Sequence, residues 1–256
     1  MVNVDFGLTV NDYAKHRAGF PESFFERVAT YGVGLSGQVV VDVGTGTGTL
    51  ARGFARGGCV VTGVDPAANM LEQAQQLSMA EGVVVDYRVA TAEVTGLASE
   101  SADVVSAGQC WHWFDGQAAA RECYRVLRPG GKVVIAHFDW IPLKGNVDEA
   151  TEQLIETYNP AWKMGGGSGI YPHWSRHLAE NGFVNLEVFT YDTFPMYTHE
   201  AWRGRIRASA GVGASLPAEK VTAFDNDLAD VLRTRFSDDP LPVQHRVFGL
   251  MGQKAG

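Results

Sequence analysis

The sequence is short of cysteine, of basic residues and of long apolar runs. Its 256 residues include three cysteines, an odd number without a CxxC pair; this argues against a disulfide framework and a structural zinc site and favours the reducing cytoplasm. Lys and Arg number 21 against 29 Asp and Glu, so we expect no nucleic-acid partner. No apolar stretch approaches the roughly 18 residues that cross a bilayer, and Asp5 stands where a signal peptide has its apolar core. We therefore expect no membrane partner either.

What is present is a globular composition in which strand and helix patterns alternate. Hydrophobic residues make up 45% and charged residues 20% of the chain, which excludes a disordered protein. Short β-branched runs predict five strands, and apolar residues at helical spacing predict the helices between them. The expected strands are 39–43, 59–64, 83–89, 102–107 and 132–138, and the expected helices are 21–31, 49–56, 66–77 and 115–127. This alternation indicates right-handed βαβ crossovers and a parallel sheet.

The second half is less regular. Residues 140–172 are rich in Gly, Pro and aromatics, which suits a surface excursion or cap more than a core element. The elements expected after it are a helix over 173–182, a strand over 183–191, helices over 198–208 and 217–236, and a strand over 241–251. The predicted fold class is therefore α/β: a doubly wound, Rossmann-like, mostly parallel seven-stranded sheet with helices on both faces and a cap-like insertion after the fifth strand.

A glycine-rich turn at the end of the first strand is the strongest functional signal. Gly44, Gly46 and Gly48 allow a sharp turn and a close approach to a ligand at the start of a helix. Asp65 ends the second strand 21 positions after Gly44, and neighbouring parallel strands bring it beside the turn. A carboxylate there can accept hydrogen bonds from both hydroxyls of a ribose. Alternatively, or in addition, Asp65 caps a helix that begins at Pro66.

The spacing of the glycines distinguishes between nucleotides. A dinucleotide site has the pattern G-x-G-x-x-G, whereas here the glycines run G-x-G-x-G and Thr49 takes the third position. Asp42 also stands two residues before Gly44, which is unfavourable for a diphosphate. Acidic surroundings favour a ligand with a cationic end and no phosphate. A dehydrogenase with NAD(P) stays open as a weaker alternative.

Six segments of the sequence resemble the motifs of one enzyme family. They are VVDVGTGTG, VTGVDPAANML, RVATAEVTGLASESADVV, CWHWFD, YRVLRPGGKVVI, and Tyr13, Arg17 and Pro21 of a Y-x-x-x-R-x-x-x-P pattern. Together they resemble the class I S-adenosylmethionine-dependent methyltransferases, in particular the small-molecule, type 11 branch that has an HWFD motif. The resemblance covers most of the chain. It implies a methyltransferase whose cofactor is S-adenosylmethionine.

The resemblance also implies roles for individual residues. The methionine part of the cofactor would lie on Gly44, Thr45, Gly46 and Gly48, the ribose on Asp65, and the adenine near Pro66, Met70, Thr91, Ala92 and Glu93. Gln109 and Cys110 would lie near the sulfonium, and Tyr13 and Arg17 would close over the cofactor. Many members of the family have Asp at the position of Thr91, so here a hydroxyl would stand in place of the carboxylate that usually contacts the adenine amino group.

Methyl transfer from a sulfonium needs alignment of donor and acceptor and, for many acceptors, a base. His112, just past the fourth strand, is the candidate catalytic base; otherwise it is a packing residue between Trp111 and Trp113. We expect His137 to be buried structure, and His173 is a second candidate base. We see no residue pattern for a catalytic metal.

The predicted organisation is a single domain of residues 1–256. Within it, 1–35 form a helical lid, 36–139 a cofactor-binding core, 140–216 a substrate or cap region, and 217–256 a final helix and strand. The predicted partner is a small-molecule methyl acceptor, which aromatic residues around the cap would bind, and a homodimer stays open. The basic cluster Arg203, Arg205 and Arg207 is expected to be a solvated helix face. A protein that binds the cofactor without transferring methyl is the alternative from another class.

Overall fold

The computed structural model describes residues 19–256, which divide into two compact units. The sheet unit comprises 19–138, 171–190 and 247–256, and the helical unit comprises 139–170 and 191–246. Each unit is described by itself below. The single-domain organisation predicted from the sequence stays a prediction. Within the described chain, none of the helices combines the length and the apolar character that a membrane span requires.

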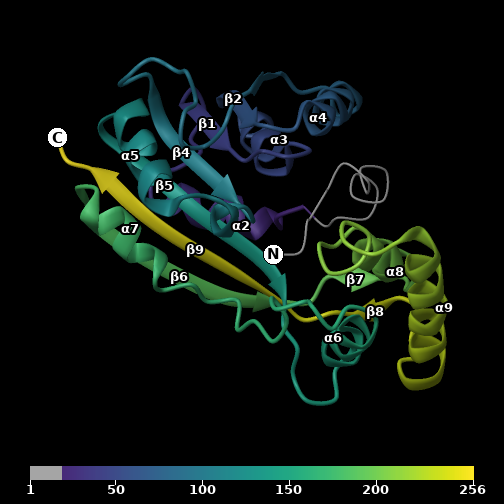
Figure 1. Cartoon of the computed structure of the whole chain (residues 1–256). Helices are drawn as coiled ribbons and strands as arrows, with labels where there is room; N and C mark the ends of the chain where they lie inside the picture. The colour runs from purple at the N-terminus through teal and green to yellow at the C-terminus, as the bar shows by residue number, and fades with distance from the viewer. Residues whose placement is uncertain (1–18) are drawn as a thin grey trace. The chain divides into compact units, whose positions relative to one another are not determined.

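A seven-stranded sheet forms the centre of the sheet unit (Figure 1), in the order β3-β2-β1-β4-β5-β9-β6. Its strands are β1 Val39–Val43, β2 Val60–Asp65, β3 Val85–Val89, β4 Ala102–Gly108, β5 Leu127–Trp140, β6 Phe183–Thr193 and β9 His245–Lys254. Neighbours among β1 to β5 are parallel, and the arrow of β9 in Figure 1 points opposite to that of β5. The mostly parallel α/β fold predicted from the sequence is confirmed.

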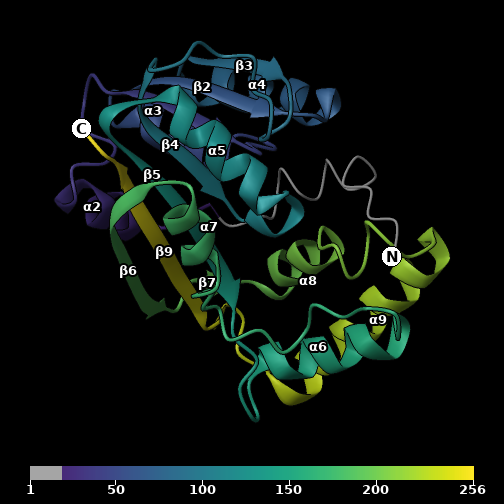
Figure 2. The same cartoon turned by 60° about the vertical axis from the view of Figure 1, so that its left-hand side comes forward.

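Five helices cover this sheet. They are α2 Glu22–Thr30, α3 Thr49–Arg56, α4 Ala68–Glu81, α5 Gly116–Val126 and α7 Trp174–Glu180. Figures 1 and 2 show α5 and α7 on one face and α3 and α4 on the other, as right-handed crossovers in the two directions from β1 require. Asp115 caps α5, because its carboxylate accepts the N–H groups of Gln117 and Ala118.

The start of α4 differs from the prediction. The helix begins at Ala68 and not at Pro66, and Ala67 before it is extended, with φ −90° and ψ 99°. The cause is local: Oδ1 of Asp65 accepts the N–H of Ala67 at 2.9 Å. This bond to the backbone two residues on is a turn that competes with the helix.

The helical unit contains a helix that the sequence did not indicate. The unexpected helix is α6, Val147–Tyr158. The unit also contains α8 His199–Arg207, α9 Ala218–Arg235 and the short strands β7 Met196–Tyr197 and β8 Leu241–Pro242. The expected final strand over 241–251 is therefore split into β8 and β9. Asn146 caps α6 by accepting the N–H of Glu149, and Val147 and Ile155 join an apolar cluster with α8 and α9. Glycines and prolines on either side of α6 concealed it.

The basic cluster on α8 is not a solvated face. Arg203 and Arg207 both bind the carboxylate of Asp225 on α9, and Arg205 is 7% exposed. Arg203 and Arg207 therefore belong to an ion-pair network, whereas Arg205 between them is buried in the interior of the unit. The prediction was wrong because the sequence pattern did not show that α9 supplies an acidic partner at this face.

Candidate functional site

The glycine turn between β1 and α3 needs its glycines. Gly44, Gly46 and Gly48 have φ of 63°, 55° and 80°, a region that side chains other than glycine rarely adopt. Space is also limiting, since a Cβ on Gly44 would lie 2.7 Å from the ring of Phe114 and 2.8 Å from Sγ of Cys110. The first glycine therefore lets the segment 110–114 lie directly against the turn.

Asp42 in β1 is a buried carboxylate beneath this turn. It is 2% exposed and accepts the hydroxyls of Thr45 and Ser106, both at 2.6 Å. Burial raises the pKa of Asp42 to about 6, and these hydrogen bonds limit the rise. The sequence indicated Asp42 only as an obstacle to a diphosphate. Its bond to Ser106 follows from the pairing of β1 with β4, in which Asp42 lies opposite Ser106, and no local pattern shows it.

Asp65 links the ends of β1 and β2. Its Oδ2 accepts the N–H of Gly46 at 2.9 Å, while Oδ1 accepts that of Ala67. The side chain is partly buried, and burial raises its pKa. Each carboxylate oxygen can accept a second hydrogen bond. Asp65 is thus held in a fixed orientation with acceptor capacity left over.

The residues expected around an adenine follow β2 and β3. Pro66 is exposed and Met70 is buried on α4. After β3, Thr91 is exposed and pairs with Val94 in an isolated bridge, and Ala92 is buried. Glu93 accepts the backbone N–H of Asp115 at 3.1 Å, which ties this loop to the start of α5.

The turn after β4 carries an unusual backbone conformation at Gln109. Its φ of 56° is in the left-handed region although it is not a glycine, and such residues concentrate at functional sites. The backbone N–H of Gln109 donates to the carbonyl of Ala136 at 2.8 Å, and the side-chain amide donates to the carbonyl of Phe138. The chain then turns to Cys110, whose thiol donates to the carbonyl of Val43 at 3.3 Å.

His112 lies in a cluster of rings in the sheet unit. Its ring centre is 5.3 Å from that of His137, which lies 4.6 Å from Tyr171 and 5.0 Å from Trp174. His112 is half-buried and His137 is buried. His137 is thus interior, as expected, but it also adjoins the candidate base, which the sequence did not indicate. His173 is exposed beside Trp174.

These residues converge because parallel strands end at one edge of the sheet. The turn 44–48, Asp65, the loop 91–93 and the segment 109–112 follow the carboxyl ends of β1, β2, β3 and β4. Tyr13 and Arg17 lie outside the described residues. Among residues 19–256, no three His, Cys, Asp or Glu side chains gather in a way that could hold a metal ion.

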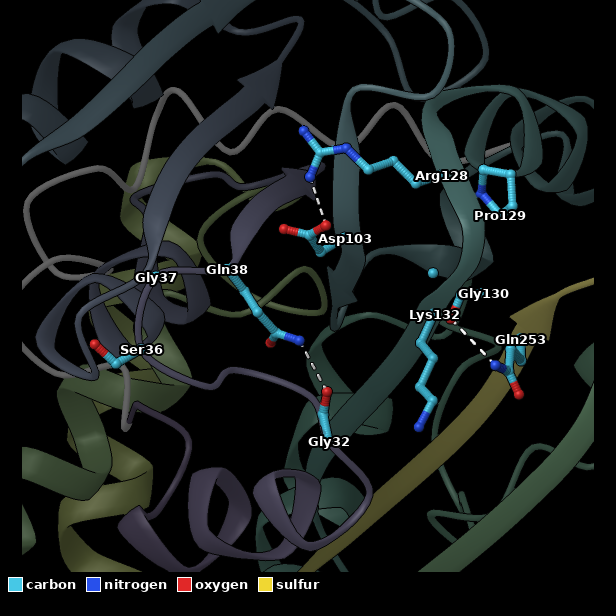
Figure 3. Close-up of a pocket in the computed structure, with 11 residues that line it drawn as sticks. Gly32, Ser36, Gly37, Gln38, Asp103, Arg128, Pro129, Gly130, Lys132 and Gln253 are labelled. Carbon is cyan, nitrogen blue, oxygen red and sulfur yellow. Dashed lines mark hydrogen bonds and ion pairs between the residues drawn. The ribbon is translucent and has the colours of Figure 1, made fainter. Parts of the chain in front are cut away.

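A different cavity, of about 680 Å³, lies at the amino ends of β1 and β4 (Figure 3). Both of its basic side chains are engaged: Arg128 pairs with Asp103 at 2.5 Å, and the Lys132 ammonium donates to the carbonyl of Tyr31. Since β1 and β4 are parallel, this cavity is at the opposite end of those strands from the glycine turn. It is therefore separate from the candidate site.

Comparisons with known proteins agree with this arrangement. A family model described as "Methyltransferase domain" matches residues 41–135. A ubiquinone biosynthesis O-methyltransferase of Xanthomonas axonopodis pv. citri is 38% identical over 179 residues, 68% of this chain and 72% of that protein. An uncharacterized methyltransferase of Schizosaccharomyces pombe is 25% identical over 237 residues, 91% of this chain and 89% of the other.

A similar fold is also found among solved structures. A candidate type II methyltransferase of Anaeromyxobacter dehalogenans has a TM-score of 0.66 at 23% identity, with 93% of this chain and 97% of the other covered. The chain spans 44% of the length of Pseudomonas proteins named ubiquinone biosynthesis O-methyltransferase. The family model, the Xanthomonas relative and the shared fold lead to one conclusion: the chain belongs to the class I S-adenosylmethionine-dependent methyltransferases, enzymes whose methyl donor is S-adenosylmethionine.

Proposed function

We propose that this methyltransferase acts in the cytoplasm on a small organic molecule and transfers the methyl group to an oxygen, nitrogen or carbon atom by in-line displacement. The observation that carries the proposal is that the turn 44–48, Asp65 and His112 follow the carboxyl ends of parallel strands in one sheet. A binding turn, a carboxylate acceptor and a candidate base are thereby available at a single edge.

The donor set around the turn fits the cofactor. Asp65 has acceptor capacity beyond its bonds to Gly46 and Ala67, which suits the two hydroxyls of a ribose. Asp42 and Asp65 favour a cationic ligand. Arg52 of α3, which could otherwise attract a phosphate, binds Glu81 at 2.8 Å and the carbonyl of Thr47.

The other positions keep the roles that the resemblance implies. We assign the methionine part to Gly44, Thr45, Gly46 and Gly48, the adenine to Pro66, Met70, Thr91, Ala92 and Glu93, and the sulfonium to the vicinity of Gln109 and Cys110. When bound, S-adenosylmethionine supplies a methyl group on a positively charged sulfur. The chain's own task is to hold the acceptor in line, exclude water and remove a proton.

We assign the removal of that proton to His112. Its imidazole is half-buried and lies beside His137, so it can accept a proton while its ring is held by neighbours. An oxygen acceptor is favoured, because a hydroxyl must lose its proton to become a good nucleophile. The name of the Xanthomonas relative, an O-methyltransferase, points the same way. The exposed indole of Trp113, next to His112, supports a flat or apolar acceptor.

The test is methyl transfer from radiolabelled S-adenosylmethionine to phenols, amines and carbon acids, with labelled products identified by mass spectrometry. We expect label in a hydroxyl compound. His112→Ala should lower turnover about 10²- to 10⁴-fold, with an affinity for S-adenosylhomocysteine unchanged within about twofold. Unaltered turnover in this variant would remove His112 as the base.

Two other outcomes would contradict the proposal itself. If the protein binds the cofactor tightly but labels no compound of the panel or of a cell extract, the result would support a protein that binds the cofactor without transferring methyl. If absorbance shows that the protein oxidises or reduces a nicotinamide cofactor, the result would instead support an NAD(P)-dependent oxidoreductase.

A further inference from the structure

One hydrogen bond in the sheet unit requires a particular protonation state of a histidine. The indole N–H of Trp111 donates to Nδ1 of His177 at 3.1 Å. An indole nitrogen is only a donor, so Nδ1 must present a lone pair. The neutral ring of His177 therefore carries its proton on Nε2. If Nδ1 were protonated as well, two N–H donors would face each other.

Trp111 is the buried anchor of the segment that contains the candidate base. It is 1% exposed and directly precedes His112 in the short 3₁₀ helix η2, Trp111–Trp113. Its ring meets Phe114 edge to face at 5.7 Å, and Phe114 occupies the space next to Gly44. The position of Trp111 thus bears on both the base and the first glycine of the turn.

His177 approaches Trp111 because α7 packs closely against the start of α5. A Cβ on Gly116, the first residue of α5, would lie 2.2 Å from Nδ1 of His177. Burial lowers the pKa of His177, and the neighbouring His173 lowers it further.

Two carboxylates act in the other direction. Glu180 on α7 and Asp115 at the cap of α5 raise the pKa of His177. Both are engaged elsewhere: Glu180 binds Arg176 at 2.7 Å and accepts the side-chain amide of Gln117, and Asp115 caps α5. Burial is the first cause of the shift, so the net direction favours the neutral ring and the bond to Trp111.

We propose that His177 is a positioning residue: its Nδ1 lone pair holds Trp111, and with it His112, against the glycine turn, so that proton uptake by His177 disturbs the site. The catalytic consequence rests on the proposed function of His112. The hydrogen bond and its loss on protonation do not, and they are tested separately.

The direct test is a pH titration of the tryptophan indole N–H signals by ¹H–¹⁵N NMR between pH 5 and 8, with Trp111 assigned through Trp111→Phe. The Trp111 signal should shift with a midpoint below the ordinary range of histidine. In His177→Asn the shift should vanish, because Oδ1 of Asn stands near the place of Nδ1 and accepts at every pH. The indole of Trp202 is the internal control, since it donates to the hydroxyl of Thr151 at 3.1 Å, a group that does not titrate.

The kinetic test separates positioning from mere packing. At pH 7.5, His177→Phe, which lacks an acceptor, should lower kcat about five- to tenfold, as expected for one lost hydrogen bond, while KM for the cofactor changes less than twofold. His177→Asn should restore kcat and remove the His177 contribution to the acid limb of the pH profile.

The outcomes distinguish the two proposals. A Trp111 signal that stays fixed while the ring of His177 titrates would overturn the positioning role. Equal kcat in His177→Phe and His177→Asn would also overturn it. If instead His112→Ala keeps full turnover while Trp111 still follows His177, the base assignment fails and the hydrogen-bond switch stands.

Discussion

The two units treat buried charge differently. In the sheet unit, the carboxylate of Asp42 accepts two hydroxyls, and its pKa rises only to about 6. In the helical unit, Asp148 on α6 is fully buried; its Oδ2 accepts the side-chain amide of Asn146, but its Oδ1 has no hydrogen-bond partner among the described residues. Burial, and after it the charge of Glu152, raises the pKa of Asp148 to about 8. A complete set of donors therefore offsets much of the desolvation that an incomplete set leaves in place.

Two further groups of the helical unit follow the same pattern. Burial lowers the pKa of Arg205, whose guanidinium lies 4.9 Å over the ring of Trp140. Burial, with the charge of Arg205, lowers the pKa of His245 to about 4. The helical unit thus buries groups that would be more stable in water, whereas the sheet unit surrounds the buried carboxylate of Asp42 with hydroxyl donors. We therefore expect the free energy of unfolding to depend on pH most strongly through the buried groups of the helical unit.

The largest effect is expected from Asp148→Asn. The pKa of Asp148 is about 8 in the folded protein and near 3.8 in the unfolded chain. The contribution of Asp148 to the free energy of unfolding is therefore fully present below about pH 4 and is lost as the pH rises through 8. Asn cannot ionise, so the variant should gain on the order of 5 kcal/mol relative to the native protein at pH 9, and little at pH 4. Urea unfolding at both pH values measures this. A pH-independent difference would mean that Asp148 is already satisfied when charged, and the contrast with Asp42 would disappear.

The sequence predicts features that depend on neighbouring residues, but not contacts between residues far apart in the chain. Asp115 as a cap, the strand that ends at Asp65 and the positive-φ glycines follow from local patterns, and the structure has them. The register that brings Ser106 to Asp42 and the packing that brings α7 to Trp111 join residues far apart in the chain, so no local pattern contains them. The helix α6 is a local element, yet its capping Asn146 stands among turn-forming residues, and burial against α8 and α9 stabilises it.

The second largest effect concerns binding. Asp65→Ala should weaken the affinity for S-adenosylmethionine about 100-fold, because two hydrogen bonds to a charged acceptor are lost. Titration calorimetry measures the affinity, and circular dichroism should show an intact fold. Asp86→Ala is the matched control, since this carboxylate on β3 is 55% exposed and pairs with Arg88; it should bind normally. Equal affinities in the two variants would reject the ribose role of Asp65.

A smaller effect is expected when Asp42 loses one of its two hydroxyl donors and so, like Asp148, becomes a buried carboxylate with an incomplete set of donors. Ser106→Ala removes one hydroxyl donor from a buried carboxylate, at an expected cost of about 2 kcal/mol at pH 8, where Asp42 is ionised. At pH 4.5 the carboxyl is protonated, and the cost should be about half or less. Thermal unfolding at both pH values measures the difference. The pKa of Asp42, followed by NMR, should rise in the variant; an unchanged pKa would show that the Ser106 bond does not stabilise the charge.

The smallest effect tests the packing of α7 on α5. Gly116 does not have a positive φ, so helix propensity alone predicts that Gly116→Ala stabilises the protein, by up to about 1 kcal/mol. We expect a loss of about 1 kcal/mol instead, because the new Cβ would meet the ring of His177 at 2.2 Å. Combining it with His177→Ala, which removes the ring atoms that the new Cβ would meet, should recover most of that loss, as a double-mutant cycle in urea can measure. If Gly116→Ala is stabilising by itself, the ring of His177 can move away without cost, and α7 does not hold Trp111 as rigidly as the sheet unit holds Asp42.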